Sequence, residues 1–215
     1  MIINSIFLPV TKSAGGLTFA KWKGKNTARA RIFSNDSSTP PQIFQRARFR
    51  WVIFLMTLIG KDIIKLLWQV YEKNTTYTNE CAKYNVPLQP NYVSKKIPFE
   101  AYAPNFKLGK GSLEQVALSG DQTYEQSTGI VTVNWSNIIT GNGRATDKVV
   151  VVIADGEKLI SKSDLTKTRA DTTTTINMSI GSSGASMTVF ISAYADDISG
   201  KRTVANGDAK DVTVI

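Results

Sequence analysis

The chain has 215 residues, of which 42% are hydrophobic and 20% charged, a composition typical of globular proteins rather than of disordered chains or fibres. It contains no histidine and one cysteine, Cys81, which excludes a Ser-His-Asp or Cys-His catalytic centre, an intrachain disulfide and a cysteine-based zinc site. The net charge of +9 is uneven: residues 1–105 hold 15 basic against 5 acidic side chains, and residues 106–215 hold 11 against 12. A compositional boundary therefore lies near residue 105.

Residues 16–33 are predicted to form a β-hairpin. Two short, partly alternating runs flank Lys23-Gly24-Lys25, where Gly24 can adopt the positive φ that a tight turn needs. Phe19 and Ile32 are then expected on one face of the hairpin and the basic side chains on the other. Residues 34–38 are expected to form a polar loop.

A helix is predicted to begin after this loop. Thr39 is placed to be the N-cap, Pro40 occupies the first helical position, and Gln42 completes a capping box. Residues 42–74 are helical in composition, and we expect Gly60 to divide them into helices of about 18 and 13 residues. A further short helix is expected over residues 76–84.

The longest apolar run, Trp51–Ile59, covers about nine residues, roughly half of a bilayer span, and charged residues flank it on both sides. The start of the chain lacks a basic region and is interrupted by Asn4, Ser5 and Pro9, so it does not fit a secretory signal peptide. We therefore expect no membrane span. A helix that is apolar on all sides is instead expected in a core or between subunits.

Residues 86–106 carry four prolines and several aromatic side chains, which indicates an extended linker that packs against the rest of the chain. Short strand-like runs separated by Gly, Asn and Asp then recur, which is typical of a sandwich of about seven strands. These runs are Ser112–Leu118, Ile130–Trp135, Lys148–Ala154, Lys158–Ser161, Thr172–Ile180, Ser186–Tyr194, Arg202–Val204 and Val212–Ile215.

The predicted fold class is therefore α+β, mainly β: an N-terminal β-hairpin and helices followed by an immunoglobulin- or fibronectin-like β-sandwich. The predicted domains are a basic hairpin and helical assembly domain over residues 1–85, the packed linker over 86–106 and the sandwich over 107–215.

Basic residues interleaved with aromatic ones form the one constellation that points to binding. This set suits contact with a nucleic-acid backbone, and it suits equally an acidic neighbouring subunit, where Arg and Trp are favoured contact residues. A third interpretation is a solvated basic face. The candidate binding residues are Lys21, Trp22, Lys23, Lys25, Arg29, Arg31, Arg46, Arg48, Arg50 and Trp51.

Other motifs are weaker indications of a functional site. Gly109-Lys110-Gly111-Ser112 lacks the spacing of a phosphate-binding loop and opens a strand rather than a helix. The acidic pairs Asp196-Asp197 and Asp208 with Asp211 could supply calcium ligands, but solvated turn aspartates are the more frequent case. We therefore expect no metal, no cofactor, no small-molecule substrate and no enzymatic activity.

Several short motifs in a fixed order resemble a known family. They are Gly16, Lys23-Gly24-Lys25 and Arg29, then Thr39-Pro40-Pro41-Gln42 and Gln45-Arg46-Ala47-Arg48-Phe49, then Lys110-Gly111-Ser112-Leu113, Val133-Asn134-Trp135 and Asp147-Lys148-Val149. Together they resemble an uncharacterised family of Bacteroides-group bacteria and their phages, over residues 15–215. The resemblance implies a virion or phage-assembly role and supplies no catalytic residues.

We therefore expect a virion structural protein, assembled in the host cytoplasm, that forms a homo-oligomeric ring or connector in the head-to-tail region and contacts other virion proteins. Closed symmetry would let each copy cover the apolar helix of the next. One alternative is a nucleic-acid-binding accessory protein that uses the basic N-terminal half. A second alternative is a surface-adhesion sandwich module that binds carbohydrate.

Overall fold

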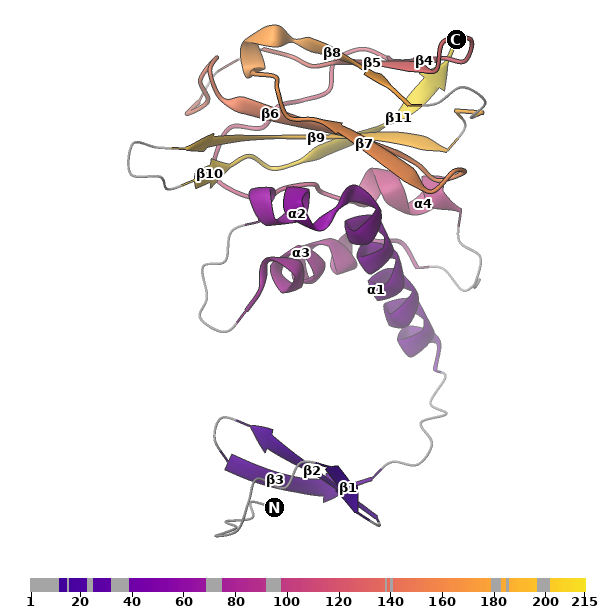
Figure 1. The fold of residues 1–215 in the computed structure, drawn as a ribbon, viewed down its shortest axis with the longest axis vertical. Helices are drawn as coiled ribbons and strands as arrows, with labels where there is room; N and C mark the ends of the chain where they lie inside the picture. Colours follow the sequence, from indigo (N-terminus) through magenta and orange to yellow (C-terminus); the bar gives the residue numbers. More distant parts are fainter. Residues whose placement is uncertain are drawn as a thin grey trace. The chain divides into compact units, whose positions relative to one another are not determined.

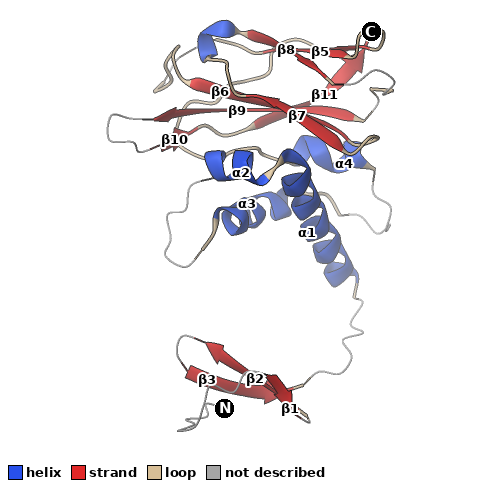
Figure 2. Cartoon of the chain, in the orientation of Figure 1, coloured by secondary structure: helices blue, strands red, loops and turns tan. Residues whose placement is uncertain are grey.

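The structure, a computed structural model, describes residues 12–14, 16–22, 25–31, 39–68, 75–91, 98–137, 139, 141–178, 183–184, 186–196 and 202–215. The chain is a mixed α+β protein with a few helices and a large, nearly closed β-sheet (Figures 1 and 2). It divides into two compact units, residues 1–39 and residues 40–215. These units do not follow the predicted boundaries at residues 85 and 106.

The first unit is a three-stranded antiparallel sheet of β1 (Lys12–Ala14), β2 (Leu17–Trp22) and β3 (Lys25–Ala30). The pairing of β2 with β3 runs from Leu17 opposite Ala30 to Trp22 opposite Lys25, which confirms the predicted hairpin. The strand β1 was not expected from the sequence. The turn at Gly24, the position of Ile32 and the loop over residues 34–38 lie outside the described residues.

The helices begin where the sequence predicts but differ in length. The first, α1 (Pro40–Ile59), starts at Pro40, and Gly60, with a φ of 105°, separates it from α2 (Lys61–Leu67). The predicted extension of the second helix to residue 74 is wrong, because Trp68 is extended and ends it. The Trp68 side chain turns inward, and its Nε1 donates to the carbonyl oxygen of Leu108 at 2.9 Å.

The next segments are helical rather than extended. The predicted short helix is confirmed as α3 (Tyr77–Asn85), with Thr76 as its N-cap. The prediction of an extended linker over residues 86–106 is wrong for the described part, which forms η1 (Val86–Leu88), α4 (Phe99–Tyr102) and η2 (Ala103–Asn105). Local helical turns allow Phe99, Tyr102 and Phe106 to be buried together.

The large sheet has eight strands in the order β7-β6-β9-β11-β4-β5-β8, with β10 paired to β9. Its strands are β4 (Gln122–Glu125), β5 (Ile130–Asn134), β6 (Lys148–Asp155), β7 (Ile160–Asp164), β8 (Thr173–Asn177), β9 (Met187–Asp196), β10 (Arg202–Val204) and β11 (Asp208–Val214). All pairs are antiparallel except β11 with β4. The outer strands β7 and β8 approach each other, since Thr174 Oγ1 donates to Asp164 Oδ2 at 2.6 Å.

One predicted strand is absent. Residues 112–118 form no strand and join the sheet only through isolated bridges, of Leu113 with Ala205 and of Leu118 with Trp135. The first strand of this sheet is instead β4, and its Gln122 side chain bonds the backbone of Asn134 in β5. A short η3 turn (Arg169–Asp171) precedes β8.

Two apolar clusters meet at the central strands. Val149, Val151 and Ile153 of β6 point into the sheet's own core, whereas Val150, Val152 and Ala154 pack with the helices. The continuous apolar run of β6 reflects this burial on both faces. The helices α1 and α2 therefore share a core with the sheet, and the chain from residue 40 onward forms one unit (Figure 1).

Gln89 is a polar residue that is buried in the interior of the protein. Its side chain is 1% exposed, and neither its amide nitrogen nor its amide oxygen has a hydrogen-bond partner within the described part of the chain. A buried amide without partners loses its bonds to water and gains none in return.

We expect Gln89→Met to raise the free energy of unfolding by about 1–3 kcal/mol, because it removes this cost at nearly constant volume. Urea denaturation followed by tryptophan fluorescence measures the change. A matched Gln126→Met change on the exposed turn after β4 should alter the stability little. A loss of stability in the Gln89 variant contradicts the prediction.

Candidate functional site

The predicted binding residues divide between the two compact units. Lys21, Trp22, Lys25 and Arg29 belong to β2 and β3, and the exposed Arg31 follows β3. Arg29 is exposed and lies opposite Thr18 in the register, whereas Lys23 is outside the described residues. The other candidates belong to α1 in the second unit, and they are Arg46, Arg48, Arg50 and Trp51.

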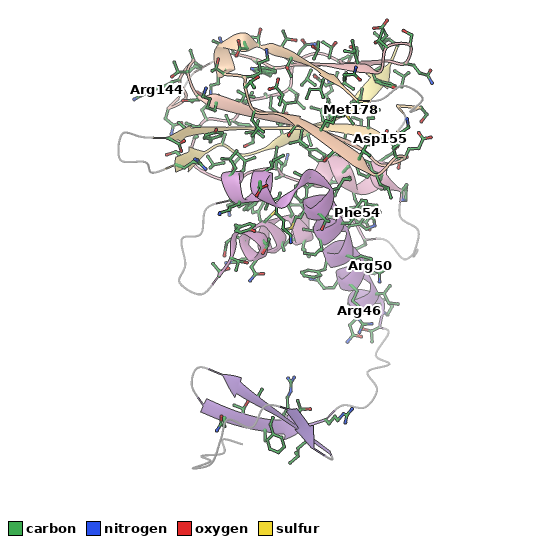
Figure 3. All side chains as sticks on the ribbon, in the orientation of Figure 1. Arg46, Arg50, Phe54, Arg144, Asp155 and Met178 are labelled. Atoms are coloured by element: carbon green, nitrogen blue, oxygen red, sulfur yellow. The ribbon has the colours of Figure 1, made fainter. Side chains whose placement is uncertain are left out.

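The N-terminal part of α1 is poorly covered. All four buried side chains of this helix, Val52, Leu55, Met56 and Ile59, lie in its second half. None of the side chains from Pro40 to Trp51 is buried, although several of them are apolar. Figure 3 shows Arg46 and Arg50 on the part of α1 that is farthest from the β-sheet.

Two cations and two apolar side chains share the exposed face of this helix. Arg46 and Arg50, at positions i and i+4, are exposed as predicted. Phe49 is 51% exposed and Ile53 is 38% exposed beside them. Gln45, Arg46, Phe49 and Arg50 line a shallow hollow of ≈ 420 Å³. We call Gln45, Arg46, Phe49, Arg50 and Ile53 the α1 surface.

Two of the predicted binding residues on α1, Arg48 and Trp51, contact other segments of the chain. Arg48 Nη2 donates to Asn91 Oδ1 at 2.6 Å, which ties the helix to the segment after α3. Trp51 stacks on Tyr102, with ring centroids 5.2 Å apart and planes at 15°. Each residue advances about 100° around a helix, so neighbours in sequence face different ways. Arg48 and Trp51 therefore hold α1 in place and lie off its exposed face.

Phe49 and Ile53 were not among the binding residues predicted from the sequence. Both stand on the face marked by Arg46 and Arg50, and their spacing of four residues places them on one side of the helix. Large apolar residues at that spacing on a cationic face were the signal that could have identified them. The chemistry of the α1 surface is apolar contact flanked by positive charge, which suits an acidic or polyanionic partner with an apolar patch.

A second polar region lies at the end of the sheet where β6 begins. Figure 3 shows Arg144 at this end of the sheet and Asp155 at the opposite end. The buried Arg169 pairs with the buried Asp147 there, with Nε and Oδ2 3.0 Å apart, and its Nη2 donates to the carbonyl oxygen of Glu114. A hollow of ≈ 410 Å³ opens above this pair, and we call it the end hollow.

The motifs that resembled ligand sites have structural partners. Asp196 pairs with Arg202 at 2.7 Å and raises the pKa of Arg202 above its ordinary value through that hydrogen bond. Asp208 accepts from the backbone of Leu118, and Asp211 accepts from Thr188 Oγ1. Asp197 lies outside the described residues. In the part of the chain that the structure describes, no cluster of three His, Cys, Asp or Glu side chains is placed to hold a metal ion.

The Gly109–Ser112 segment is a close backbone crossing. A Cβ on Gly111 would lie far inside the van der Waals contact distance of the Val204 carbonyl oxygen, and a Cβ on Gly207 would lie 2.5 Å from the Leu108 nitrogen. We call the contact of residues 108–111 with residues 204–207 the glycine crossing. It joins the segment after η2 to the corner between β10 and β11.

The lone thiol is buried as well. Cys81 is 0% exposed in α3, and burial raises the pKa of its thiol to about 12 against a weaker opposing effect of the Asn85 side chain. The thiol is therefore protonated at neutral pH and does not act as a nucleophile there. Among the described helices, none is both long and apolar enough to span a membrane.

Fold and surface together define a mixed α+β protein in which a helical layer covers one face of a nearly closed sheet and presents a basic, partly apolar helix end. The chain belongs to a family of unknown function (DUF6266), whose model matches residues 10–207. The resemblance to an uncharacterised family is confirmed to that extent, while its association with Bacteroides-group bacteria and phages stays a prediction. No curated protein matches the chain.

Proposed function

We propose that the protein is a non-enzymatic virion structural protein of a phage, which forms an oligomeric ring or connector in the head-to-tail assembly. The observation that carries the proposal is the exposure of Phe49 (51%) and Ile53 (38%) beside Arg46 and Arg50 on the α1 surface. Apolar side chains in such a setting are typical of protein interfaces, where Arg and aromatic residues contribute most of the binding energy.

A ring accounts for this surface because closed symmetry gives every copy the same neighbour. The α1 surface of one copy would then pack against the next copy, and the cations would select an acidic rim around the apolar contact. Covering Phe49 and Ile53 in every copy would stabilise the ring relative to the free subunit.

The first unit supports the same proposal. Its sheet has three strands, and Ala28 is the one buried side chain among those described there. Three strands are the least that gives a sheet independent stability, and covering an apolar face of such a sheet stabilises it further. In the proposed assembly a neighbouring subunit supplies that cover, and Arg29 and Arg31 contribute to the basic rim.

The test is the mass of the purified chain and of two variants, by light scattering and native mass spectrometry. The wild type should form a closed oligomer of defined size. Phe49→Ser with Ile53→Ser should weaken the assembly by about 2–3 kcal/mol, roughly a hundredfold in affinity, and release monomers. Leu165→Ser removes a comparably exposed (41%) leucine from the turn after β7 and should leave the oligomer intact.

A wild-type chain that stays monomeric, even with its virion partners present, overturns the proposal. Equal dissociation in the Leu165 variant would assign the effect to general destabilisation, and it would count against the α1 surface.

The alternative of nucleic-acid binding is favoured by one specific observation, the exposure of Arg46 and Arg50 one helical turn apart. It predicts DNA affinity that falls steeply with salt and is lost in Arg46→Glu with Arg50→Glu, while Phe49→Ser with Ile53→Ser retains it. Fluorescence anisotropy at several salt concentrations separates the two functions. Absence of binding by the wild type at low salt removes the alternative.

We also propose that the eight-stranded sheet is a sandwich of the fibronectin type III kind. Two groups of strands, β7-β6-β9-β11 and β4-β5-β8, join through the parallel pair of β11 with β4. In the second group, buried residues alternate with more exposed ones, as on strands that cover a core with one face. The fold by itself assigns no function.

A further inference from the structure

The end hollow is a second candidate site, independent of the α1 surface and of the function proposed above. It lies at one end of the sheet, between the connection from β5 to β6 and the ends of β9 and β10. Its volume of ≈ 410 Å³ falls in the range of small-molecule sites. The residues that line it and matter for the argument are Asn142, Arg144, Thr146, Lys148, Tyr194 and Thr203.

The charged side chains that line the hollow without an ion-pair partner among the described residues are both positive. Its two carboxylates already have partners, because Asp196 takes both a 2.7 Å and a 3.2 Å bond from Arg202 and Asp147 pairs with Arg169. Arg144 and Lys148 are both exposed, and neither forms an ion pair within the described part of the chain. A hollow with two available cations attracts an anion.

Hydrogen bonds fix the described part of the loop that carries Arg144. Asn142 accepts from the backbone nitrogen of Glu114 at 2.8 Å and donates to the carbonyl oxygen of Ser112 at 2.9 Å. The backbone nitrogen of Arg144 donates to Asp147 Oδ2 at 2.8 Å. Binding therefore costs little ordering of the backbone, and Arg144 can offer its planar fork to a carboxylate or phosphate.

The rest of the lining suits a hydroxylated ligand. Thr146 and Thr203 line the hollow and can offer hydroxyl groups. Tyr194 is also in the lining, and the Arg202 guanidinium lies 4.8 Å from its ring centroid. Hydroxyl groups beside the cations match the hydroxyls of an acidic sugar better than they match a bare inorganic anion.

We infer that the end hollow binds an acidic sugar, with Arg144 and Lys148 contacting its carboxylate or phosphate group and the threonine hydroxyls contacting the sugar hydroxyls. The sequence led us to expect no small-molecule ligand, and this site departs from that expectation. It gives the carbohydrate-binding alternative a defined location on the sheet.

Isothermal titration calorimetry of the full chain tests the inference with glucuronate, glucose 6-phosphate, glucose and inorganic phosphate. At least one of the two acidic sugars should bind with a Kd below about 1 mM, and the stronger of them identifies the acidic group. Glucose and inorganic phosphate should each bind at least about tenfold more weakly, since glucose lacks the acidic group and inorganic phosphate lacks the sugar hydroxyls.

Arg144→Gln and Lys148→Gln should each lower the affinity for the acidic sugar by about tenfold or more, because each removes a charge-assisted hydrogen bond. Lys158→Gln, in the turn at the other end of β6, is the matched control and should bind as the wild type does. The inference is overturned if neither acidic sugar binds, if inorganic phosphate binds as tightly as the sugars, or if the Lys158 variant is weakened equally.

Discussion

Replacing Asp147 with Asn is expected to lower the free energy of unfolding by about 3–5 kcal/mol. The Arg169 side chain is 2% exposed and the Asp147 side chain 3% exposed, so water cannot solvate the guanidinium when its carboxylate is lost. Removing one partner leaves a buried charge without compensation, which costs far more than the pair contributes when intact. Urea denaturation followed by tryptophan fluorescence gives the free energy.

The exposed pair of Arg202 and Asp196 is the matched control. Its side chains are 33% and 44% exposed, so solvent already screens the charges. Asp196→Asn should cost about 0–1 kcal/mol. If the two Asp→Asn variants lose the same stability, burial is not what gives the Arg169 pair its importance. The double variant Arg169→Met with Asp147→Leu should lose less than Asp147→Asn, because no buried charge remains.

Gly111→Ala is expected to destabilise the protein by about 3 kcal/mol. At the glycine crossing the new methyl group would overlap the backbone around the Val204 carbonyl, and a backbone cannot move aside as a flexible side chain can. The same carbonyl accepts the backbone nitrogen of Leu113 at 3.0 Å, so a displacement also loses that bond. Thermal denaturation should show a lower Tm with unchanged secondary structure below the transition.

Gly141→Ala provides the comparison for this effect. A Cβ there would meet the Glu114 carboxyl group at 3.7–3.8 Å, which is ordinary van der Waals contact. We therefore expect a change within about 0.5 kcal/mol. A large loss at Gly141 with a small loss at Gly111 would contradict the account of the crossing.

The local elements could be predicted because their signals are local. The Thr39-Pro40 start, the break at Gly60 and the β2–β3 hairpin depend on residues a few positions apart. The end of α2 could not be predicted, because Trp68 leaves the helix to reach Leu108, about forty residues away in sequence. For the same reason, the short helical turns between residues 86 and 106 gain their stability from the core they enter.

The candidate site was predictable in part. The charges of Arg46 and Arg50 and their shared helix face followed from spacing alone. The structural roles of Arg48 and Trp51 did not, because Asn91 and Tyr102 are distant in sequence. The end hollow was equally hidden, since its lining comes from segments that become neighbours only when β6 pairs with β9.

The position of β11 determines when this protein can finish folding. Among the backbone pairings of the large sheet, β11 alone joins the group that contains β6 and β9 to the group that contains β4 and β5. In a chain without residues 208–214 both groups could still form, but each would expose an unpaired strand edge, β9 in one and β4 in the other. Chains interrupted before β11 would be prone to aggregation or proteolysis, so the large sheet is complete only in chains made through this strand.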